Sequence, residues 1–190
     1  MKTIAVSILC GGKSSRMQSE KGLVLFQGVP FIEHIIKAVL PIASQIQLIT
    51  NSVDYDYLAY KKIKDIELDK GPIGGIYSAL THSNSELNLI LSCDIPLIST
   101  ELLLELIQKH EEKMQISVFS DSEQIHPLIG IYSKKILQIL KEAINNSNLR
   151  MMDIIHNVDA QIIKVGADKS NQFRNINSVA ELNELNTNLS

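Results

Sequence analysis

Residues 3–22 read TIAVSILCGGKSSRMQSEKG, and this stretch decides the fold expected for the chain. The apolar run TIAVSIL is typical of a strand buried on both faces of a parallel sheet. Gly11 and Gly12 follow it and lack a Cβ atom, so the backbone can turn sharply there and direct N–H groups at an anion. The basic residues that come next are Lys13, Arg16 and Lys21. A strand followed by such a loop predicts a phosphate-binding site with a nucleotide as its ligand.

Two common phosphate-binding motifs do not match this loop. A P-loop needs a glycine five positions before its Gly-Lys-Ser triplet, and Ser7 occupies that position here. A dinucleotide fingerprint needs the spacing G-x-G-x-x-G, but the first glycine after Gly12 is Gly22. Taken alone, the stretch would also suit an ordinary solvated loop after a strand. The nucleotide interpretation therefore depends on residues elsewhere in the chain.

The composition predicts one compact domain over residues 1–190. A chain of 190 residues that is 45% hydrophobic can bury a single good core, and no long linker, repeat or low-complexity tract divides it. The formal charge of -3 and the absence of Trp provide no basic surface or stacking platform for a nucleic acid. No segment approaches the ~18 apolar residues that span a bilayer. The two cysteines form no metal-binding cluster, so we expect a protein of the reducing cytoplasm.

Patterns typical of buried strands alternate with helical patterns along the first half of the chain. Besides residues 3–9, apolar runs at 46–50 and 87–92 predict central strands. Apolar side chains spaced three or four residues apart predict helices over 31–40 and 73–80. Such alternation predicts right-handed crossovers and a mainly parallel, doubly wound sheet with helices on both faces. The expected fold class is a three-layer α/β fold of the Rossmann-like type.

The second half continues the same layered arrangement. The predicted elements are a helix over 99–113, a strand pair at 116–120 and 126–132, helices over 133–146 and 149–157, a strand at 161–165, and a last helix opened by the capping box from Ser178 to Glu181.

Polar residues follow three of the apolar segments. In an open α/β sheet, ligands bind beyond the carboxyl ends of the strands, so Asn51, Asp69 and Asp94 are expected to face one crevice. Each of them alone would also be explained as a turn or cap residue. Asp94 is suited to hold Mg²⁺, which takes one or two carboxylates and completes its shell with phosphate oxygens and water. Asn51 and Asp69 offer an amide and a carboxylate that could bind a base or a ribose.

The chain resembles the molybdenum cofactor guanylyltransferase family in a series of motifs that cover nearly its whole length. In order, these motifs are LCGGKSSRMQSEKGL, ITN, ELDKGPIGGI, SCDIP, HPLIGIY and FRNINSVAEL. The first motif alone indicates only the wider class of nucleotidyltransferases. The complete set of motifs, in this order, resembles the guanylyltransferase family within that class. The resemblance implies the nucleotide-diphospho-sugar transferase fold and an enzyme that uses GTP and Mg²⁺. Such an enzyme transfers GMP to the terminal phosphate of molybdenum-loaded molybdopterin and releases pyrophosphate. Association with molybdoenzymes or their chaperones is compatible with this activity.

The resemblance also implies roles for individual residues. It implies a GTP site made of Leu9, Cys10, Gly11, Gly12, Lys21, Asn51, Asp69 and Asp94. Lys21 and Arg16 would act on the phosphates and Asp94 would bind the metal, so these three are the expected catalytic residues. Asn175 and Asn177 match the family's Asn-x-Asn motif and would hold the pterin, although a helix-cap role would also explain Asn177. Weaker candidates for the pterin side are Arg150 and the pair His126 and Pro127.

The first motif departs from the family's usual residues at three positions. Cys10 replaces alanine, Gln18 replaces glycine and Glu20 replaces aspartate. None of these changes removes a proposed ligand, but Gln18 would be strained at a position that needs a positive φ. Cys10 and Cys93 are expected to be small buried residues and not nucleophiles, because no histidine is placed in the sequence to activate them.

Two other functions remain open from the sequence. A related nucleotidyltransferase of the same fold would use CTP or a sugar 1-phosphate, although the Gly11-Gly12 pair resembles the guanylyl branch more than the cytidylyl branch. A non-catalytic module that binds nucleotide or pterin would bind GTP without releasing pyrophosphate. The presence of Lys21 and Asp94 argues against such a module, because binding alone does not require a metal carboxylate.

Overall fold

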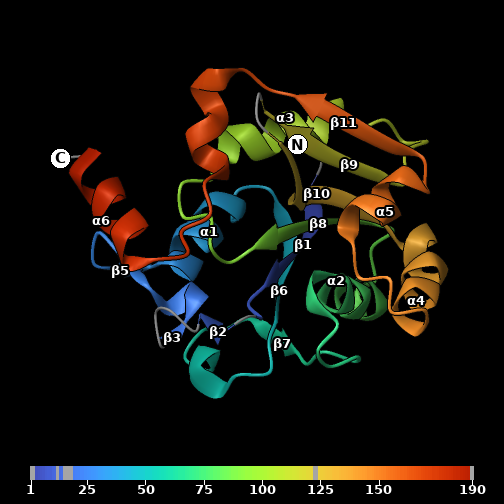
Figure 1. Cartoon of the computed structure of the whole chain (residues 1–190), viewed down its shortest axis with the longest axis horizontal. Helices are drawn as coiled ribbons and strands as arrows, with labels where there is room; N and C mark the ends of the chain where they lie inside the picture. Colours follow the sequence, from blue (N-terminus) through green and yellow to red (C-terminus); the bar gives the residue numbers. More distant parts are fainter. Residues whose placement is uncertain (1–2, 12, 15–18, 122–123, 189–190) are drawn as a thin grey trace.

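The computed structural model describes residues 3–11, 13–14, 19–121 and 124–188. Its centre is a seven-stranded sheet. In spatial order the strands are β11 (Ala160–Lys164), β9 (Ile116–Ser120), β10 (Ile125–Ser133), β8 (Leu87–Ser92), β1 (Ile4–Leu9), β6 (Ala43–Ile49) and β7 (Lys61–Ile63). Neighbouring strands are parallel, except that β10 runs antiparallel to both β8 and β9. The mainly parallel α/β sheet predicted from the sequence is confirmed (Figure 1).

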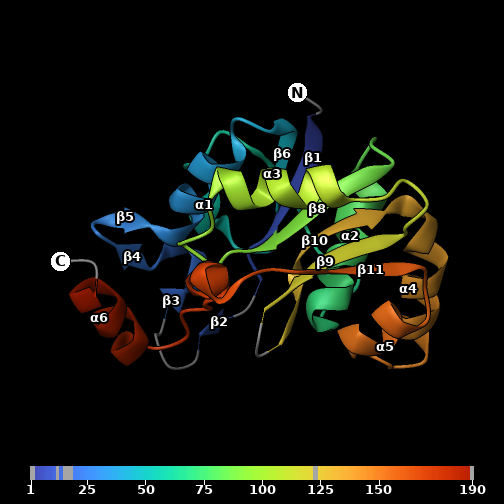
Figure 2. The ribbon, with the colours of Figure 1, turned by 90° about the horizontal axis from the view of Figure 1, so that it is seen from above.

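Helices cover both faces of this sheet, as Figure 2 shows. One face packs against α1 (Phe31–Val39) and α3 (Thr100–Lys109). The other face packs against α2 (Gly71–His82), α4 (Leu137–Asn145) and α5 (Met151–His156). Side chains of β1 alternate between these two cores: Ile8 contributes to the first and Leu9 to the second. Because both sides of the strand are buried, its sequence is apolar except for Ser7, whose Oγ accepts a hydrogen bond from Gln47 Nε2.

Short elements lie outside the central sheet. Two hairpins are formed by β2 (Lys13–Ser14) with β3 (Ser19–Glu20), and by β4 (Leu25–Phe26) with β5 (Val29–Pro30). The 3-10 helices are η1 (Lys21–Leu23), η2 (Val53–Tyr55), η3 (Lys134–Ile136) and η4 (Ala167–Phe173). The last helix, α6 (Val179–Asn188), lies beside the β4–β5 hairpin in both ribbon views. Apolar side chains join them, because Leu182 packs against a small core that contains Phe26 and Ile176.

Most predicted elements are present with shifted ends, and one strand at the edge of the sheet was not predicted. The segment 66–68, which precedes Asp69, belongs to bends and turns. The edge strand is β7, which comes before this segment in the chain. Its sequence, Lys-Lys-Ile, is short and mostly polar, since an edge strand has only one neighbour and needs few buried side chains. Within the described ranges, no helix is long and apolar enough to cross a membrane.

Candidate active site

A cavity of about 850 Å³ opens at the carboxyl ends of β1, β6 and β8. Parallel strands end at the same edge of a sheet, so the residues that follow them are brought together there. Every residue predicted for the nucleotide site whose position is described lines this cavity. Those residues are Leu9, Cys10, Gly11, Lys21, Asn51, Asp69 and Asp94. Gly12 and Arg16, two further phosphate candidates, lie outside the described residues.

Lys21, Asp94 and Asn177 meet at one side of the cavity. Lys21 begins η1, and its ammonium Nζ lies 3.2 Å from Oδ2 of Asp94. The same Nζ donates a hydrogen bond of 2.6 Å to the amide Oδ1 of Asn177. Asp94 follows β8 in the chain, whereas Asn177 comes from the segment that leads into α6. An ammonium group has three N–H donors, so one of them stays available for a phosphate.

The carboxylate of Asp94 has an unused oxygen. Asp94 is buried, and its Oδ1 has no hydrogen-bond partner within the described part of the chain. A buried carboxylate oxygen is costly to leave unpaired, so it indicates a ligand such as a cation. The described residues contain no cluster of three or more His, Cys, Asp or Glu side chains that could hold a metal alone. A single carboxylate is adequate for Mg²⁺ when phosphate oxygens and water complete its shell.

Asn51 forms a reciprocal pair with Asp65, a residue that the sequence analysis missed. Nδ2 of Asn51 donates to Oδ2 of Asp65 over 3.0 Å, and the backbone N–H of Asp65 donates to Oδ1 of Asn51 over 3.1 Å. Both residues line the cavity. Oδ1 of Asp65 is buried without a partner among the described residues, and burial raises the pKa of this carboxyl group above its ordinary value. Asp65 therefore presents an unused acceptor to a ligand. Identifying β7 as a strand would have placed Asp65 just beyond its carboxyl end.

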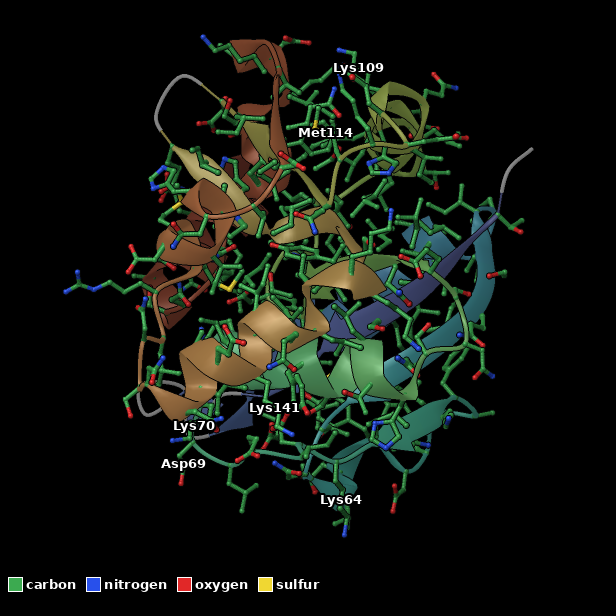
Figure 3. All side chains as sticks on the ribbon, turned by 90° about the vertical axis from the view of Figure 1, so that its right-hand side faces the viewer. Lys64, Asp69, Lys70, Lys109, Met114 and Lys141 are labelled. Atoms are coloured by element: carbon green, nitrogen blue, oxygen red, sulfur yellow. The ribbon has the colours of Figure 1, made fainter. Side chains whose placement is uncertain are left out.

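Asp69 lies on a turn at the wall of the cavity. It is exposed, and Figure 3 shows its side chain and that of Lys70 at the surface ahead of α2. Its φ is 58°, and Gly71 follows with a φ of 56°. Aspartate tolerates this left-handed conformation better than most residues, so the turn itself accounts for Asp69. Asp69 still lines the cavity, but Asp65 is the carboxylate that pairs with Asn51.

Gly11 borders open space. A Cβ atom built on it would have no atom of the described structure within 4 Å. Packing within the protein therefore does not require glycine at this position. A side chain there would occupy part of the cavity, so glycine lets the backbone approach a ligand closely.

The two cysteines are buried, as expected. Cys10 and Cys93 lie at the ends of β1 and β8 and also contribute to the cavity wall. Burial raises the pKa of the Cys10 thiol well above its ordinary value. A thiol with a raised pKa is a poor nucleophile, which agrees with a packing role.

A second cavity of about 510 Å³ lies next to Asn177. Asn175 and His126 both line it. The His126 ring stacks on the ring of Phe173, with 4.3 Å between the ring centroids. Nε2 of His126 lies 3.3 Å from a carboxylate oxygen of Asp121. The Lys21–Asn177 hydrogen bond joins this cavity to the first one. The pterin-side candidates Asn175, Asn177 and His126 thus gather around one hollow beside the nucleotide cavity.

Arg150 and Pro127 are not brought to this hollow. Arg150 is exposed at the start of α5, and neither it nor Pro127 lines either cavity. Leu128, the residue after Pro127, reaches the nucleotide cavity instead.

Several solved structures have a fold similar to that of this chain. The chain superposes on molybdopterin-guanine dinucleotide biosynthesis protein A from Archaeoglobus fulgidus with a TM-score of 0.82, at 19% identity and with 98% of each chain covered. It superposes on a CMP:2-keto-3-deoxy-manno-octonic acid synthetase with a TM-score of 0.73, at 14% identity, covering 100% of this chain and 98% of that one. At such identities these likenesses establish the nucleotide-diphospho-sugar transferase type of fold.

The sequence itself matches one family. The family model of the MobA-like NTP transferase domain matches residues 6–160. A relative from Flavobacterium johnsoniae, named "Probable molybdenum cofactor guanylyltransferase", is 64% identical over 190 residues and is covered completely, as is this chain. The molybdenum cofactor guanylyltransferase of Photobacterium profundum is 30% identical, with 93% of this chain and 92% of that protein covered. The chain therefore belongs to the molybdenum cofactor guanylyltransferase family.

Proposed function

We propose that the protein transfers GMP from GTP to the phosphate of molybdopterin, forming the guanine dinucleotide cofactor and releasing pyrophosphate. The observation that carries this proposal is the junction of the two cavities, where Lys21 lies between Asp94 and Asn177. GTP would occupy the larger cavity and molybdopterin the smaller one, so the reacting phosphates would meet at the Lys21 ammonium. All 190 residues would act as one unit in the cytoplasm, as composition and cysteine content suggest.

The chemistry needs charge screening more than it needs a base. The attacking group is a phosphate monoester whose second pKa of about 6 leaves it mostly anionic at neutral pH. Its approach to the α-phosphorus of GTP brings two anions together. The remaining N–H donor of Lys21 would bind a phosphate oxygen and lower this repulsion in the transition state. Mg²⁺ held by the free oxygen of Asp94 would supply further positive charge to the phosphates when bound.

Asn51 and Asp65 are proposed to bind the guanosine end of GTP. Their hydrogen bonds to one another fix both side chains, so the free Oδ1 of Asp65 has a defined direction. An acceptor of this kind can pair with ribose hydroxyls or with the N–H groups of guanine. The open space beside Gly11 would let the nucleotide lie close to the backbone.

The test is pyrophosphate release with Mg²⁺ and molybdenum-loaded molybdopterin, comparing GTP, CTP, ATP and UTP. GTP should be used selectively, and Asp94→Asn should lower turnover by roughly 100-fold or more while the protein stays folded. Asp159→Asn is the matched control, because Asp159 is exposed and lines neither cavity. Preference for CTP would move the protein to the cytidylyl branch. GTP binding without pyrophosphate release would instead support a binding module.

A further inference from the structure

Glu181 is linked to Lys21 by a short series of hydrogen bonds through Asn177. Oε2 of Glu181 accepts from the backbone N–H of Asn177 over 2.6 Å. Oδ1 of the same asparagine accepts from Nζ of Lys21, also over 2.6 Å. Lys21 in turn lies 3.2 Å from Asp94. A helix residue that contacts neither Lys21 nor Asp94 in the described contacts is thereby connected to both.

The bond from Glu181 differs from an ordinary capping interaction. In a capping box, the acidic side chain accepts from the N–H of the cap residue itself, which here is Ser178. The Glu181 carboxylate accepts from the preceding residue, Asn177, while its own N–H donates to Oγ of Ser178 over 3.2 Å. The helix cap therefore depends on Oγ of Ser178, whereas the restraint on Asn177 depends on the carboxylate of Glu181. Each can be removed by a separate substitution.

Asn177 is restrained from both sides. The N–H of the preceding residue, Ile176, donates to the carbonyl of Asp94 over 3.0 Å, and the Ile176 side chain is fully buried. With its own N–H held by Glu181, the backbone of Asn177 has little freedom, so its side chain is directed at Lys21. Removal of the Glu181 carboxylate would free this N–H and relax the direction of the amide.

The Lys21 ammonium binds both the Asn177 amide and the Asp94 carboxylate, and the amide influences how closely it approaches the carboxylate. Nζ lies 2.6 Å from the amide oxygen of Asn177 and 3.2 Å from Oδ2 of Asp94, so the ammonium is divided between the amide and the carboxylate. Without the amide, the ammonium would pair more closely with Asp94. That pairing would compete with a cation for the carboxylate and would misplace the donor meant for phosphate.

From these contacts we propose that Glu181 is a positioning residue of the active site. It holds Asn177 so that the Lys21 ammonium is shared between Asn177 and Asp94, which leaves Asp94 open to a cation and Lys21 open to phosphate. The proposal rests on the proposed function in taking Asp94 as the cation ligand.

The test compares five variants by two measurements: turnover of GMP transfer at saturating substrates, and Mn²⁺ affinity in the presence of GTP, followed by the electron paramagnetic resonance signal of free Mn²⁺. The variants are Glu181→Ala, Glu181→Gln, Ser178→Ala, Asn177→Ala and the double variant Glu181→Ala/Asn177→Ala. Asp94→Asn gives the reference for a lost cation site. Circular dichroism shows whether each variant is folded.

Glu181→Ala and Asn177→Ala should each lower both quantities by about tenfold, the usual size for a residue that orients a ligand. Their double variant should be no worse than Asn177→Ala, because both changes break one connection. Glu181→Gln keeps an acceptor oxygen and should stay within about twofold of the wild type, as should Ser178→Ala, which removes only the cap.

Three results would overturn the proposal. Glu181→Ala could keep the turnover and Mn²⁺ affinity of the wild type, or the double variant could lose as much as the product of the two single losses. Ser178→Ala could also lose as much as Glu181→Ala, which would mean that helix stability alone is responsible. Failure of the proposed function is distinguishable from these. It would appear as absent GMP transfer by the wild-type protein, while the pattern of Mn²⁺ affinities among the variants would still decide the role of Glu181.

Discussion

Asp65 and Asp94 are carboxylates on the wall of the same cavity, and their surroundings differ. Asp94 has the Lys21 ammonium at 3.2 Å, whereas Asp65 has the neutral amide of Asn51 at 3.0 Å. Burial raises the pKa of Asp65, and the hydrogen bond from Asn51 offsets part of that rise. Ionised Asp65 is thus disfavoured by folding, which is a common cost of residues kept for binding.

This cost predicts a pH-dependent stability for Asp65→Asn. A raised pKa in the folded state means that ionisation of Asp65 destabilises the fold as pH rises above the ordinary value of 3.8. The variant should therefore unfold at an equal or higher temperature than the wild type near pH 7, and the difference should vanish at about pH 3, below the ordinary pKa. Because Asp65 is partly exposed, the gain should stay below about 1 kcal/mol.

The same variant should bind GTP more weakly. In asparagine one carboxylate oxygen is replaced by an NH₂ group, which cannot accept a hydrogen bond from the ligand. Thermal unfolding at both pH values and titration with a fluorescent GTP analogue check the two halves of the prediction. If the Asp65→Asn variant unfolds at a clearly lower temperature than the wild type at neutral pH, burial of the Asp65 carboxylate does not destabilise the fold.

Gly11→Ala tests whether the glycine loop approaches the nucleotide. Its methyl group meets no atom of the described structure, so the free energy of unfolding should change by less than about 0.5 kcal/mol. In the complex the methyl group would overlap the ligand at a cost of about 1–3 kcal/mol, which lowers GTP affinity about fivefold or more.

The control is Gly130→Ala, whose Cβ would lie 2.7 Å from a Val118 side-chain carbon. It should show the opposite result, with lower stability and unchanged GTP affinity of the folded protein. Equal GTP affinity of Gly11→Ala and wild type would show that the nucleotide does not contact this loop.

Among the secondary-structure elements, those with apolar residues on both faces were predictable. β1 and β8 are buried on two sides, so their composition alone indicated strands at the centre of a parallel sheet. β7 has three residues and one neighbour, and its lysines gave no strand signal. Because this strand was not predicted, Asp65, which pairs with Asn51, was left out of the predicted site.

The start of α6 was also predictable, but its connection to the site was not. The capping box from Ser178 to Glu181 marked the beginning of a helix, and Ser178 does accept from the N–H of Glu181. Where that helix lies depends on contacts between segments far apart in the sequence. The hydrogen bond from Lys21 to Asn177 spans 156 positions, and local patterns carry no information about it.

The segment before α6 should be held mainly by Ile176. Its side chain is fully buried in a small core with Val24, Phe26 and Phe31. Ile176→Ala should therefore lower the free energy of unfolding by about 2–5 kcal/mol. Ile162→Ala is the matched control, since Ile162 on β11 is 41% exposed and should cost less than about 1 kcal/mol. Urea unfolding measures both, and equal losses would mean that this core does not anchor the segment.

For the molecule as a whole, the sheet brings the N-terminal half and the C-terminal segment to one place. The nucleotide cavity lies at the carboxyl ends of β1, β6 and β8. The segment before α6 contributes Asn177 and lines the second cavity. The two hollows meet at Lys21, which explains how a single fold could hold two anionic substrates and screen their repulsion.

Transfer of the nucleotide itself tests this account most directly. GTP labelled at its α-phosphate is incubated with Mg²⁺, molybdenum-loaded molybdopterin and the protein, and the pterin product is separated and weighed by mass spectrometry. The account predicts a product that carries GMP and the label, made by the wild type and nearly absent with Asp94→Asn. A pterin product that lacks the α-phosphate label, while GTP binds the protein, would contradict it.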